Sequence, residues 1–477
     1  MRTSVVVVGA GISGLAAAWE LTGGAAGPTP ETPRVEIIEA SDRVGGSLAT
    51  TRFLDATIDL GPDGFLARRT EAVALVHELG LDRELVPIAT SGASIFLDGA
   101  THPLPEGLVL GVPVSLDQVR AVKGLSWRAR LDARRDLTWP RRLVVGDDVT
   151  VGEILRTKLG RELSYRFIEP MIGGIQAGRI DTLSAKSVAP FLLDAAREGG
   201  SLMRALRRRT ANLAASGEAA PPLFYSLRGG LGSLPLSLTT RLLERGVVVR
   251  YGVSVTALRR TPSGNYPFEV DAAVTTTPSN AVIVSTPARV TGALLGRYHP
   301  DLAALEQIES AGAAMITFAL EATALPPGTG VLVPLQTSWR GEGSLMVTAL
   351  SFLDRKWPHL AHEGVALVRA HVGRVDDARW VSMSDEELRT RVEAELNVLL
   401  PGRGPSRETR VQRWPASLPQ YYLNHDQLVA RARAAAGGLG VHLAGMTYDG
   451  VGVPASIGSG RRAGRDVLAA LAGAPVR

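Results

Sequence analysis

The sequence predicts an α/β protein (α+β overall) in which a nucleotide-binding domain with a parallel sheet is joined to a mixed sheet and a helical region. The first observation is the opening stretch VVVVGAGISGLAAAWEL, where four valines run through a group of glycines into an alanine-rich helix. The second is the C-terminal stretch HLAGMTYDGVGVPASIGSGRRAGRDVLAALAG, which again predicts a strand, a glycine-rich turn and a helix. Because this order builds parallel sheets, we expect both ends to join one domain and the middle to form another.

Length and composition indicate an ordinary globular protein with more than one domain. The chain has 477 residues, of which 45% are hydrophobic and 21% charged, and it is too long for a single core. It contains no cysteine, which excludes disulfides, thiolate nucleophiles and cysteine-ligated metals. No apolar run reaches the roughly 20 residues that span a bilayer, and we find no targeting signal. We therefore expect a cytoplasmic protein, with peripheral contact to a membrane as the remaining alternative.

The net charge of +5 is carried mostly by arginine, since the chain has only four lysines. Arginines gather at Arg128, Arg130, Arg134 and Arg135, and again at Arg207–Arg209, in segments that predict helices. Such clusters fit a solvated or ion-paired helix face, with an anionic membrane or ligand surface as the alternative. Because no aromatic residues are interleaved with the charges, a nucleic-acid partner is not expected.

The elements follow in order along the chain. Residues 4–64 alternate strand and helix signals, with GGAAGPTPETP as a loop before the strand VEIIEA. Residues 70–209 predict mostly helices, and AAPPLFYSLRGGLGSLP marks a breakpoint before the helix LSLTTRLLERG and the strand VVVRYGVSVTALRR. AVIVSTPARV predicts a buried strand. AAMITFALEA, GVLVPL and SLMVTALSFL predict neighbouring strands of a second sheet, and SDEELRTRVEAELNVLLPG predicts an amphipathic helix.

These elements suggest three parts. We expect a discontinuous nucleotide-binding domain made of residues 1–70, 220–290 and 405–477. Residues 71–219 are expected to form a mostly helical subdomain, and residues 291–404 a substrate-binding region of sheet and helix.

The first chemistry-bearing motif is Gly9-Ala10-Gly11-Ile12-Ser13-Gly14, which follows a strand and opens a helix. The first glycine of such a motif allows a tight turn, the second lets the backbone approach a pyrophosphate, and the third packs helix against strand. The helix N-terminus adds amide groups and partial positive charge. This context indicates a Rossmann-type cradle for a dinucleotide.

Glu39, at the end of VEIIE, is placed to accept a hydrogen bond from a ribose hydroxyl, and an acid there argues against NADP. Its distance from the glycines along the chain exceeds the usual ~20 residues, and the inserted GGAAGPTPETP loop explains the excess. Two further glycine-rich stretches, SDRVGGS and IDLGPDGF, are not needed by an NAD dehydrogenase. The sequence therefore favours FAD over NAD.

The ordered motifs resemble a known family. EASDRVGG after the dinucleotide motif is similar to the flavoprotein superfamily of the amine oxidases, and GPDGFLARR resembles the protoporphyrinogen and coproporphyrinogen oxidases, most of all those of Gram-positive bacteria. HPLPEGLVLGVP, FIEPMIGGIQAGRIDTLSAKSVAPF, FYSLRGGLGSLP, RWPASLPQYYLNH and GVGVPASIGSGRRAG continue the resemblance in family order along the whole chain. The resemblance implies an FAD-binding domain of amine-oxidase type, a mixed-sheet substrate domain and a helical subdomain like those that bind membranes.

The resemblance also assigns roles to individual residues. Those expected to hold the ADP half and the pyrophosphate are Gly9, Ala10, Gly11, Ile12, Ser13, Gly14, Glu39, Ala40, Arg43, Gly46 and Ser47. Those expected near the adenine or the flavin ring are Gly61, Pro62, Asp63, Gly64, Val255, Trp414, Val451, Gly452 and Val453. For Val255 and Trp414, a purely structural role stays open.

The family reaction implies that FAD takes hydrides from a porphyrinogen and that molecular oxygen reoxidises it, giving hydrogen peroxide, with no catalytic side chain and no metal required. The loop Gly173–Gly178 resembles the segment that lies against the substrate, so Gly174 and Ile175 are expected to contact it. Arg69 is a candidate partner for a propionate, with a surface arginine as the equal alternative. The resemblance further suggests that the porphyrin passes to a chelatase of the heme pathway.

The sequence departs from the family at two places. Gln176–Arg179 (QAGR) stands where the family often has Tyr-Ala-Gly-Asp, and Gly452–Ser456 (GVPAS) where it often has Gly-x-Pro-Asp-Cys. Neither change removes a group that hydride transfer requires, but both bear on substrate preference.

Several functions compete with this interpretation. An amine oxidase of the same superfamily usually carries a lysine on a central substrate-domain strand, and AAMITFALE has none. A carotenoid desaturase fits GPDGF and RWPASLPQY less well, and a non-catalytic flavin-fold or prenyl-binding protein would not need the intact glycines and Glu39. We expect coproporphyrinogen III as substrate, partly because arginine bias suggests a GC-rich bacterium, with protoporphyrinogen IX as the alternative.

Overall fold

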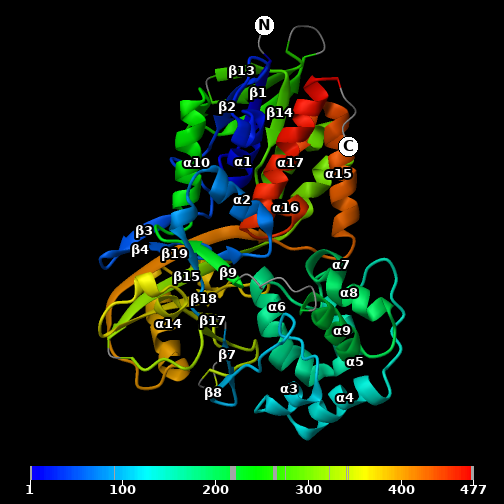
Figure 1. The fold of residues 1–477 in the computed structure, drawn as a ribbon, viewed down its shortest axis with the longest axis vertical. Helices are drawn as coiled ribbons and strands as arrows, with labels where there is room; N and C mark the ends of the chain where they lie inside the picture. Colours follow the sequence, from blue (N-terminus) through cyan, green and yellow to red (C-terminus); the bar gives the residue numbers. More distant parts are fainter. Residues whose placement is uncertain are drawn as a thin grey trace. The chain divides into compact units, whose positions relative to one another are not determined.

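The computed structural model describes residues 3–90, 92–214, 222–261, 266–273, 275–321, 323–339, 341 and 343–473. The chain forms two compact units (Figure 1). Unit 1 is made of Met1–Pro87, Pro222–Glu309 and Asp426–Arg477, and unit 2 of Ile88–Pro221 and Ser310–His425. Part of the expected breakpoint, residues 219–221, lies outside the described residues.

Unit 1 is built on a five-stranded parallel sheet in the order β10-β2-β1-β14-β20. The strands are β1 (Ser4–Val8), β2 (Arg34–Ile38), β10 (Val248–Arg250), β14 (Ala281–Val284) and β20 (Val441–Leu443). The valines of β1 and the whole of β14 are buried, as expected for strands covered on both faces. Strands from near both ends of the chain lie in this sheet, because β1 and β20 both pair with β14.

One face of this sheet is covered by α1 (Ile12–Leu21), α10 (Ser233–Glu244) and α17 (Val453–Leu471), which Figure 1 shows in blue, green and red. Helices α1 and α17 pack at close range and run in the same direction. A Cβ at Gly460 would lie 2.0 Å from the Ser13 carbonyl oxygen, and one at Gly464 would lie 2.8 Å from that of Ala17. The small residues of both helices therefore set how closely they approach.

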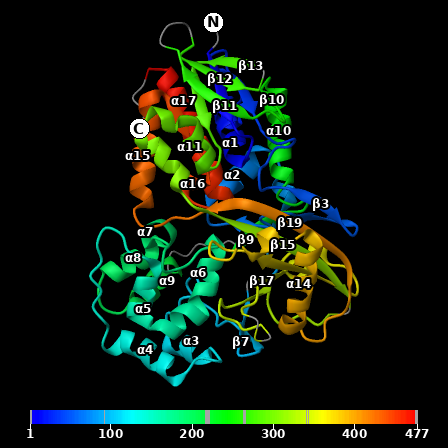
Figure 2. The same ribbon diagram turned by 180° about the vertical axis from the view of Figure 1, so that it is seen from behind.

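Smaller sheets complete unit 1. An antiparallel sheet joins β11 (Val255–Arg260), β12 (Phe268–Ala272) and β13 (Thr275–Ser279), seen from behind in Figure 2 beside α11 (Ala288–Leu295). The others are the hairpin of β3 (Thr50–Phe53) and β4 (Ala56–Asp59), and the sheet of β5 (Phe65–Leu66), β9 (Phe224–Leu227) and β6 (Leu85–Pro87). The remaining helices include α2 (Thr70–Glu78), α15 (His425–Leu439) and α16 (Met446–Asp449).

The expectation of one continuous strand over VVVRYGVSVTALRR is wrong. The segment forms β10 in the parallel sheet and β11 in the antiparallel one, with a turn between them. Gly252 has a φ of +66° and donates its N–H to the Ser41 carbonyl oxygen at 2.8 Å, so the chain leaves the first sheet there. Alternating valines predict a strand, but they do not show where it changes sheets.

Unit 2 contains a seven-stranded mixed sheet in the order β19-β15-β18-β17-β16-β7-β8. The strands are β7 (Ser94–Leu97), β8 (Ala100–Pro103), β15 (Ser310–Glu321), β16 (Gly330–Leu332), β17 (Val347–Phe352), β18 (Val365–Val372) and β19 (Ser406–Pro419). The three strands predicted for a second sheet, β15, β16 and β17, all lie in it, with β18 between β15 and β17. Residues 406–419, expected in the nucleotide-binding part, pair with β15 from Ser310 to Leu320 and so belong to unit 2.

A helical region forms the other part of unit 2. Its helices are α3 (Leu116–Ala121), α4 (Trp127–Thr138), α5 (Val151–Leu159), α6 (Glu169–Gln176), α7 (Ala185–Val188), α8 (Pro190–Arg197) and α9 (Leu202–Ala214). Their apolar faces share one core that includes Ile154, Leu155 and Ile172. Within the part of the chain that the structure describes, no helix combines the length and apolar character needed to cross a bilayer.

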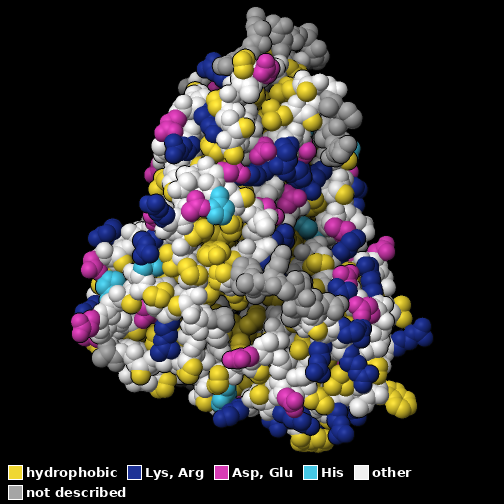
Figure 3. All heavy atoms as spheres, in the orientation of Figure 1, with side chains coloured by type: hydrophobic (Ala, Val, Ile, Leu, Met, Phe, Trp, Pro, Cys, Tyr) yellow, Lys and Arg dark blue, Asp and Glu magenta, His cyan; other side chains and the backbone are white. Residues whose placement is uncertain are grey.

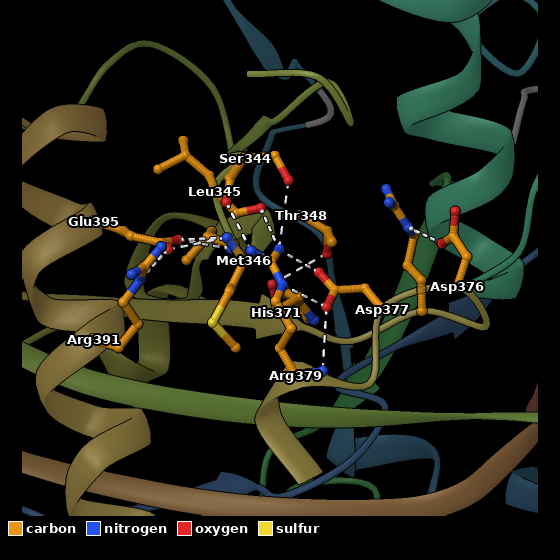
Figure 4. Close-up of polar contacts among 12 residues, drawn as sticks. Ser344, Leu345, Met346, Thr348, His371, Asp376, Asp377, Arg379, Arg391 and Glu395 are labelled. Carbon is orange, nitrogen blue, oxygen red and sulfur yellow. Dashed lines mark hydrogen bonds and ion pairs between the residues drawn. The ribbon is translucent and has the colours of Figure 1, made fainter. Parts of the chain in front are cut away.

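A buried carboxylate ties helix α14 (Asp385–Leu399) to the start of β17. Glu395 is 0% exposed, and its oxygens accept hydrogen bonds from the backbone N–H groups of Met346 and Val347 at 2.9–3.0 Å. The Arg391 Nε, one turn earlier on α14, donates to the same carboxylate at 2.8 Å (Figure 4). The short chain segment before β17 is thus fixed by a side chain rather than by sheet pairing.

Candidate functional site

The turn after β1 places Gly9–Gly14 at the carboxyl edge of the parallel sheet. Gly9 has a φ of +99°, and its N–H donates to the Ile38 carbonyl oxygen at 2.8 Å. A Cβ at Gly14 would lie 2.0 Å from the Gly9 carbonyl oxygen, so only glycine lets α1 pack this close to the end of β1. The fold itself therefore requires the first and third glycines.

Gly11 differs from the other two, because a Cβ there would meet no atom within 4 Å. Its φ of −63° suits any residue, so neither strain nor packing explains a glycine at this position. Ile12 and Ser13 are buried and begin α1, whose first backbone N–H groups have no partner within the helix. Open space beside the positive end of a helix makes a fitting place for a pyrophosphate.

Glu39 directly follows β2 and links the glycine turn after β1 to the loop after β2. Its Oε2 accepts a hydrogen bond from the Ala10 N–H at 2.7 Å, and its Oε1 accepts two from the N–H and Oγ of Ser41, at 2.8 and 2.7 Å. The Glu39 carbonyl oxygen accepts from the Val253 N–H at 2.9 Å. The carboxylate is thus oriented beside the glycine turn, with Ala40 exposed next to it.

The glycine-rich loop after β2 lies against the cradle. The Gly45 N–H donates to the Ala10 carbonyl oxygen at 2.9 Å, and a Cβ at Gly46 would lie 3.6 Å from the Gly11 Cα. The Arg43 guanidinium donates to the carbonyl oxygens of Gly46 at 2.7 Å and Val44 at 3.2 Å. Arg43 therefore stabilises the turn at Gly45–Gly46 in its own loop. Its contact with a phosphate stays a prediction.

The segment Gly61–Gly64 follows β4 and passes beside Ser47. A Cβ at Gly61 would lie 2.1 Å from the Ser47 carbonyl oxygen, so the two predicted segments touch through their backbones. Asp59, which sequence reasoning missed, is buried just before this turn and accepts a hydrogen bond from the Leu231 N–H at 2.7 Å. The sequence signal that could have identified Asp59 is an acidic residue at the end of a buried strand, just before a glycine-rich turn.

A second helix N-terminus lies near the first. Gly452, with a φ of +112°, precedes α17, and a Cβ there would meet nothing within 4 Å. Since α1 and α17 are parallel and Ser13 faces Gly460, the N-terminus of α17 extends about 9 Å past the N-terminus of α1, at 1.5 Å per residue. The predicted residues Val451–Val453 therefore open a helix beyond the cradle rather than beside it.

Asp449, also missed, supports this second turn. Its Oδ2 accepts hydrogen bonds from Arg433 at 2.6 Å and Arg462 at 3.0 Å, and it also pairs with the Ser459 hydroxyl. Burial alone would raise the pKa of Asp449, but the hydrogen bonds from Ser459 and Arg433 and the nearby positive charges outweigh it. The pKa of this carboxyl therefore lies below its ordinary value, and the ionised form holds the segment before Gly450.

Replacing Asp449 with asparagine is expected to lower the thermal midpoint at pH 7, because two arginines lose their common anion. A lowered folded-state pKa means that the stabilisation is complete above the ordinary carboxyl value of about 4 and is lost as the pH falls through the folded pKa. Thermal unfolding followed from pH 7 to pH 2 should show the difference between the variant and the parent shrinking below about pH 4. A difference that stays constant over this range contradicts the role given to the ionised carboxyl.

Two further predicted residues lie in unit 1. Val255 is half-buried at the start of β11, two residues after the Val253 N–H that bonds to Glu39. Arg69 is exposed just before α2, and its Nη1 lies 3.7 Å from Glu71 Oε1. The structure thus brings Val255 into the neighbourhood of the cradle, and the propionate role of Arg69 stays a prediction.

Three predicted residues lie in unit 2. Trp414 is half-buried on β19, opposite Ala313 of β15. The expected loop over Gly173–Gly178 is wrong, because residues to Gln176 form α6 and Ala177 ends it with a φ of +47°. Gly174 and Ile175 are exposed on this helix, and Ile175 keeps 51% of its surface.

Arg179, one of the departures from the family, has a clear structural role in unit 2. Its Nε donates to Glu169 Oε1 at 2.8 Å and its Nη1 to Asp376 Oδ2 at 2.7 Å. Glu169 is almost fully buried, and burial raises its pKa despite the charge of Arg179. The arginine therefore links α6 to the segment that follows β18, where the family pattern would have an acid.

Comparison with known proteins gives consistent matches along the chain. The model of the flavin containing amine oxidoreductase family matches residues 12–468. The coproporphyrinogen III oxidase of Bacillus subtilis is 30% identical, over 98% of this chain and 99% of that protein. The protoporphyrinogen oxidase of Bos taurus is 31% identical, over 98% and 99%. A crystal structure from Exiguobacterium sp. 255-15, assigned as a protoporphyrinogen oxidase, is 30% identical with a TM-score of 0.85, over 98% and 99% of the chains.

Proposed function

Because the chain belongs to the flavin containing amine oxidoreductase family and is an oxidoreductase, we propose that it oxidises coproporphyrinogen III to coproporphyrin III with FAD as its cofactor. The observation that carries the proposal is the pair of parallel helix N-termini in unit 1. There is open space at Gly11, next to the start of α1, and at Gly452, next to the start of α17. The Glu39 carboxylate lies beside the start of α1.

The arrangement suits a dinucleotide of FAD's kind. The amides at the start of α1 and the turn at Gly46 would bind the pyrophosphate, and Glu39 would accept a hydrogen bond from the adenosine ribose. An FMN molecule has one phosphate and no adenosine, so it would leave Glu39 and the space at Gly11 without a partner. Mass spectrometry of the cofactor released by acid from the purified protein tests this, and FMN in place of FAD contradicts it.

The chain's own residues bind and orient rather than exchange protons in this proposal. When bound, FAD would accept hydrides from the porphyrinogen and pass the electrons to molecular oxygen, which leaves as hydrogen peroxide. The N-terminus of α17 directs partial positive charge toward the space beyond the cradle, where it would favour a reduced, negatively charged flavin ring. Ionised Asp449 would keep that N-terminus in place.

Coproporphyrinogen III is favoured over protoporphyrinogen IX by the names of the relatives. The Bacillus subtilis protein is named for the first substrate and the Bos taurus protein for the second, and the identities of 30% and 31% do not separate them. The bacterial relatives from Staphylococcus aureus and Mycobacterium bovis also carry the first name. Protoporphyrinogen IX is therefore the second candidate.

The choice is tested by incubating the flavin-bound protein with each porphyrinogen in air and following porphyrin fluorescence. Coproporphyrinogen III has four carboxylates and protoporphyrinogen IX two, and one charge-assisted hydrogen bond contributes about 1.5–3 kcal/mol. We therefore expect kcat/KM to be at least about tenfold higher for coproporphyrinogen III. Equal rates, or a preference for protoporphyrinogen IX, contradict the assignment, and Gly11→Val protein without flavin provides the blank for oxidation by air.

A further inference from the structure

A cavity of about 360 Å³ in the helical region of unit 2 is lined by an unusual number of positive charges. It lies where the segment after α4 meets the end of α5 and the turn between α8 and α9. Its lining contains Arg141, Arg142, Lys158 and Arg197, and among the described residues no acid lines it. None of these residues has a part in the proposed flavin site, which lies in unit 1.

One of the residues that line the cavity carries a buried ammonium group. Lys158, in the last turn of α5, is 2% exposed, and its Nζ donates to the carbonyl oxygens of Arg141 at 2.7 Å and Gly200 at 2.9 Å. An ammonium has three N–H groups, so these two bonds leave one donor. Burial lowers the pKa of Lys158, and the charge of Asp136 offsets this only in part.

Asp136 does not neutralise the lysine by direct contact. Its two oxygens accept hydrogen bonds from the Ser201 hydroxyl at 2.8 Å and from the N–H groups of Leu202 and Met203 at 3.1 and 3.0 Å. The carboxylate is therefore occupied at the start of α9. A buried charge without a direct counter-ion is costly, and an anion in the cavity would remove that cost.

The rim supplies further donors. The Arg197 Nη2 donates to the carbonyl oxygens of Gly146 and Asp147 at 3.1 and 3.0 Å, which fixes the guanidinium at the edge while its Nε and Nη1 form no hydrogen bond to described residues. Arg142 likewise makes no side-chain hydrogen bond to described residues. Arg141 is different, because its Nη2 pairs with Asp132 at 2.9 Å. Lys158, Arg142 and Arg197 thus each keep hydrogen-bond donors that a ligand in the cavity could use.

We propose that this cavity binds a phosphate group. A phosphate monoester carries a charge of about −1.5 to −2 at pH 7 and accepts hydrogen bonds from several directions, which matches one ammonium and two guanidinium groups. A carboxylate has one charge and a planar pair of oxygens, so it would satisfy fewer of these donors. The phosphate belongs either to a free phosphorylated molecule or to the headgroup of a lipid.

The lipid source is included because of two exposed side chains that adjoin the lining residues in sequence. Trp139 and Val144, each next in sequence to a residue that lines the cavity, are both 83% exposed. Figure 3 shows basic and hydrophobic side chains gathered over α4, α5 and α8 of unit 2. A tryptophan beside a phosphate pocket suits the boundary between headgroups and acyl chains.

The test uses the flavin-bound full chain, with inorganic phosphate as the probe in a calorimetric titration at constant ionic strength. The variant combines Arg142→Glu with Arg197→Glu at the rim and leaves Lys158, which holds two segments together, unchanged. The matched control is Arg134→Glu, an exposed arginine of α4 outside the cavity. We expect the rim variant to bind phosphate at least tenfold more weakly and the control to bind it as the parent does.

Three results would overturn the proposal: no phosphate binding by the parent chain, equal binding by the rim variant, or acetate binding as strongly as phosphate. Sedimentation with phosphatidic acid vesicles and with phosphatidylcholine vesicles separates the sources. Binding to phosphatidic acid alone, lost in the rim variant and weakened by Trp139→Ala, assigns the phosphate to a lipid. Two results assign the phosphate to a free phosphorylated molecule. One is phosphate binding without vesicle binding, and the other is vesicle binding that Arg134→Glu weakens as much as the rim variant does.

Discussion

Replacing Gly11 with valine is expected to remove the flavin while leaving the fold of unit 1 intact. A side chain at this position meets no atom within 4 Å and has an ordinary φ of −63°, so the chain without cofactor accepts it. The same side chain would fill the space that the pyrophosphate needs. Loss of two charge-assisted hydrogen bonds at about 1.5–3 kcal/mol each corresponds to about 10²- to 10⁴-fold weaker binding.

The measurement is the ratio of flavin absorbance to protein absorbance after purification, together with the thermal midpoint of the cofactor-free protein. Gly14→Val is the matched comparison, because its Cβ would lie 2.0 Å from the Gly9 carbonyl oxygen and 2.6 Å from Ser285 Oγ. We expect Gly14→Val to destabilise unit 1 itself and Gly11→Val to leave its midpoint unchanged. Full flavin occupancy in the Gly11 variant would refute the cradle.

Replacing Glu395 with alanine is expected to cost about 3–5 kcal/mol of the free energy of unfolding, the usual range for removing one partner of a buried charge pair. The substitution leaves the Met346 and Val347 N–H groups and the Arg391 guanidinium without their acceptor. The site is fully buried, so water does not replace the carboxylate easily. Chemical denaturation followed by tryptophan fluorescence measures the loss, since Trp339 lies under Arg391 in unit 2.

Two variants on the same helix serve as controls. Glu395→Gln keeps one carbonyl oxygen for the backbone N–H groups and should lose less than alanine does. Glu386→Ala removes an exposed carboxylate that pairs with Arg389, and the free energy of unfolding should hardly change. Equal effects of Glu395→Ala and Glu386→Ala would show that the buried hydrogen bonds do not stabilise unit 2.

Much of the fold of unit 1 could be predicted from the sequence, because its signals are local. A valine strand, three glycines and a helix within about twenty residues predict the turn at Gly9–Gly14, and Glu39 at a strand end predicts the neighbouring acid. The structure places both together through the 2.7 Å bond from the Ala10 N–H to Glu39. The paired ends of the chain were predictable for the same reason, since each carries its own strand, turn and helix.

Other features depend on partners far away in the sequence. Asp59 bonds to Leu231, and Asp449 meets Arg433 and Arg462 only after the chain has folded. The segment Gly173–Gly178 was expected as a loop from its resemblance to the family segment, but α6 continues through it to Gln176. At Gly173 a Cβ would lie 2.7 Å from the Gly178 carbonyl oxygen, so this glycine serves close packing at a helix end rather than flexibility.

The sequence by itself predicted the glycine-rich turn, the order of most elements and the family, because these depend on short motifs whose spacing along the chain sets their geometry. The motif predicts different roles for its three glycines, but only the tertiary structure shows the open space at Gly11 and the close packing at Gly14. Only it placed the start of α17 beyond that of α1 and gathered the Lys158 cavity from three distant segments. The physical reason is that free space and buried charge are properties of what surrounds a residue, and the surroundings come from parts of the chain that no local pattern connects.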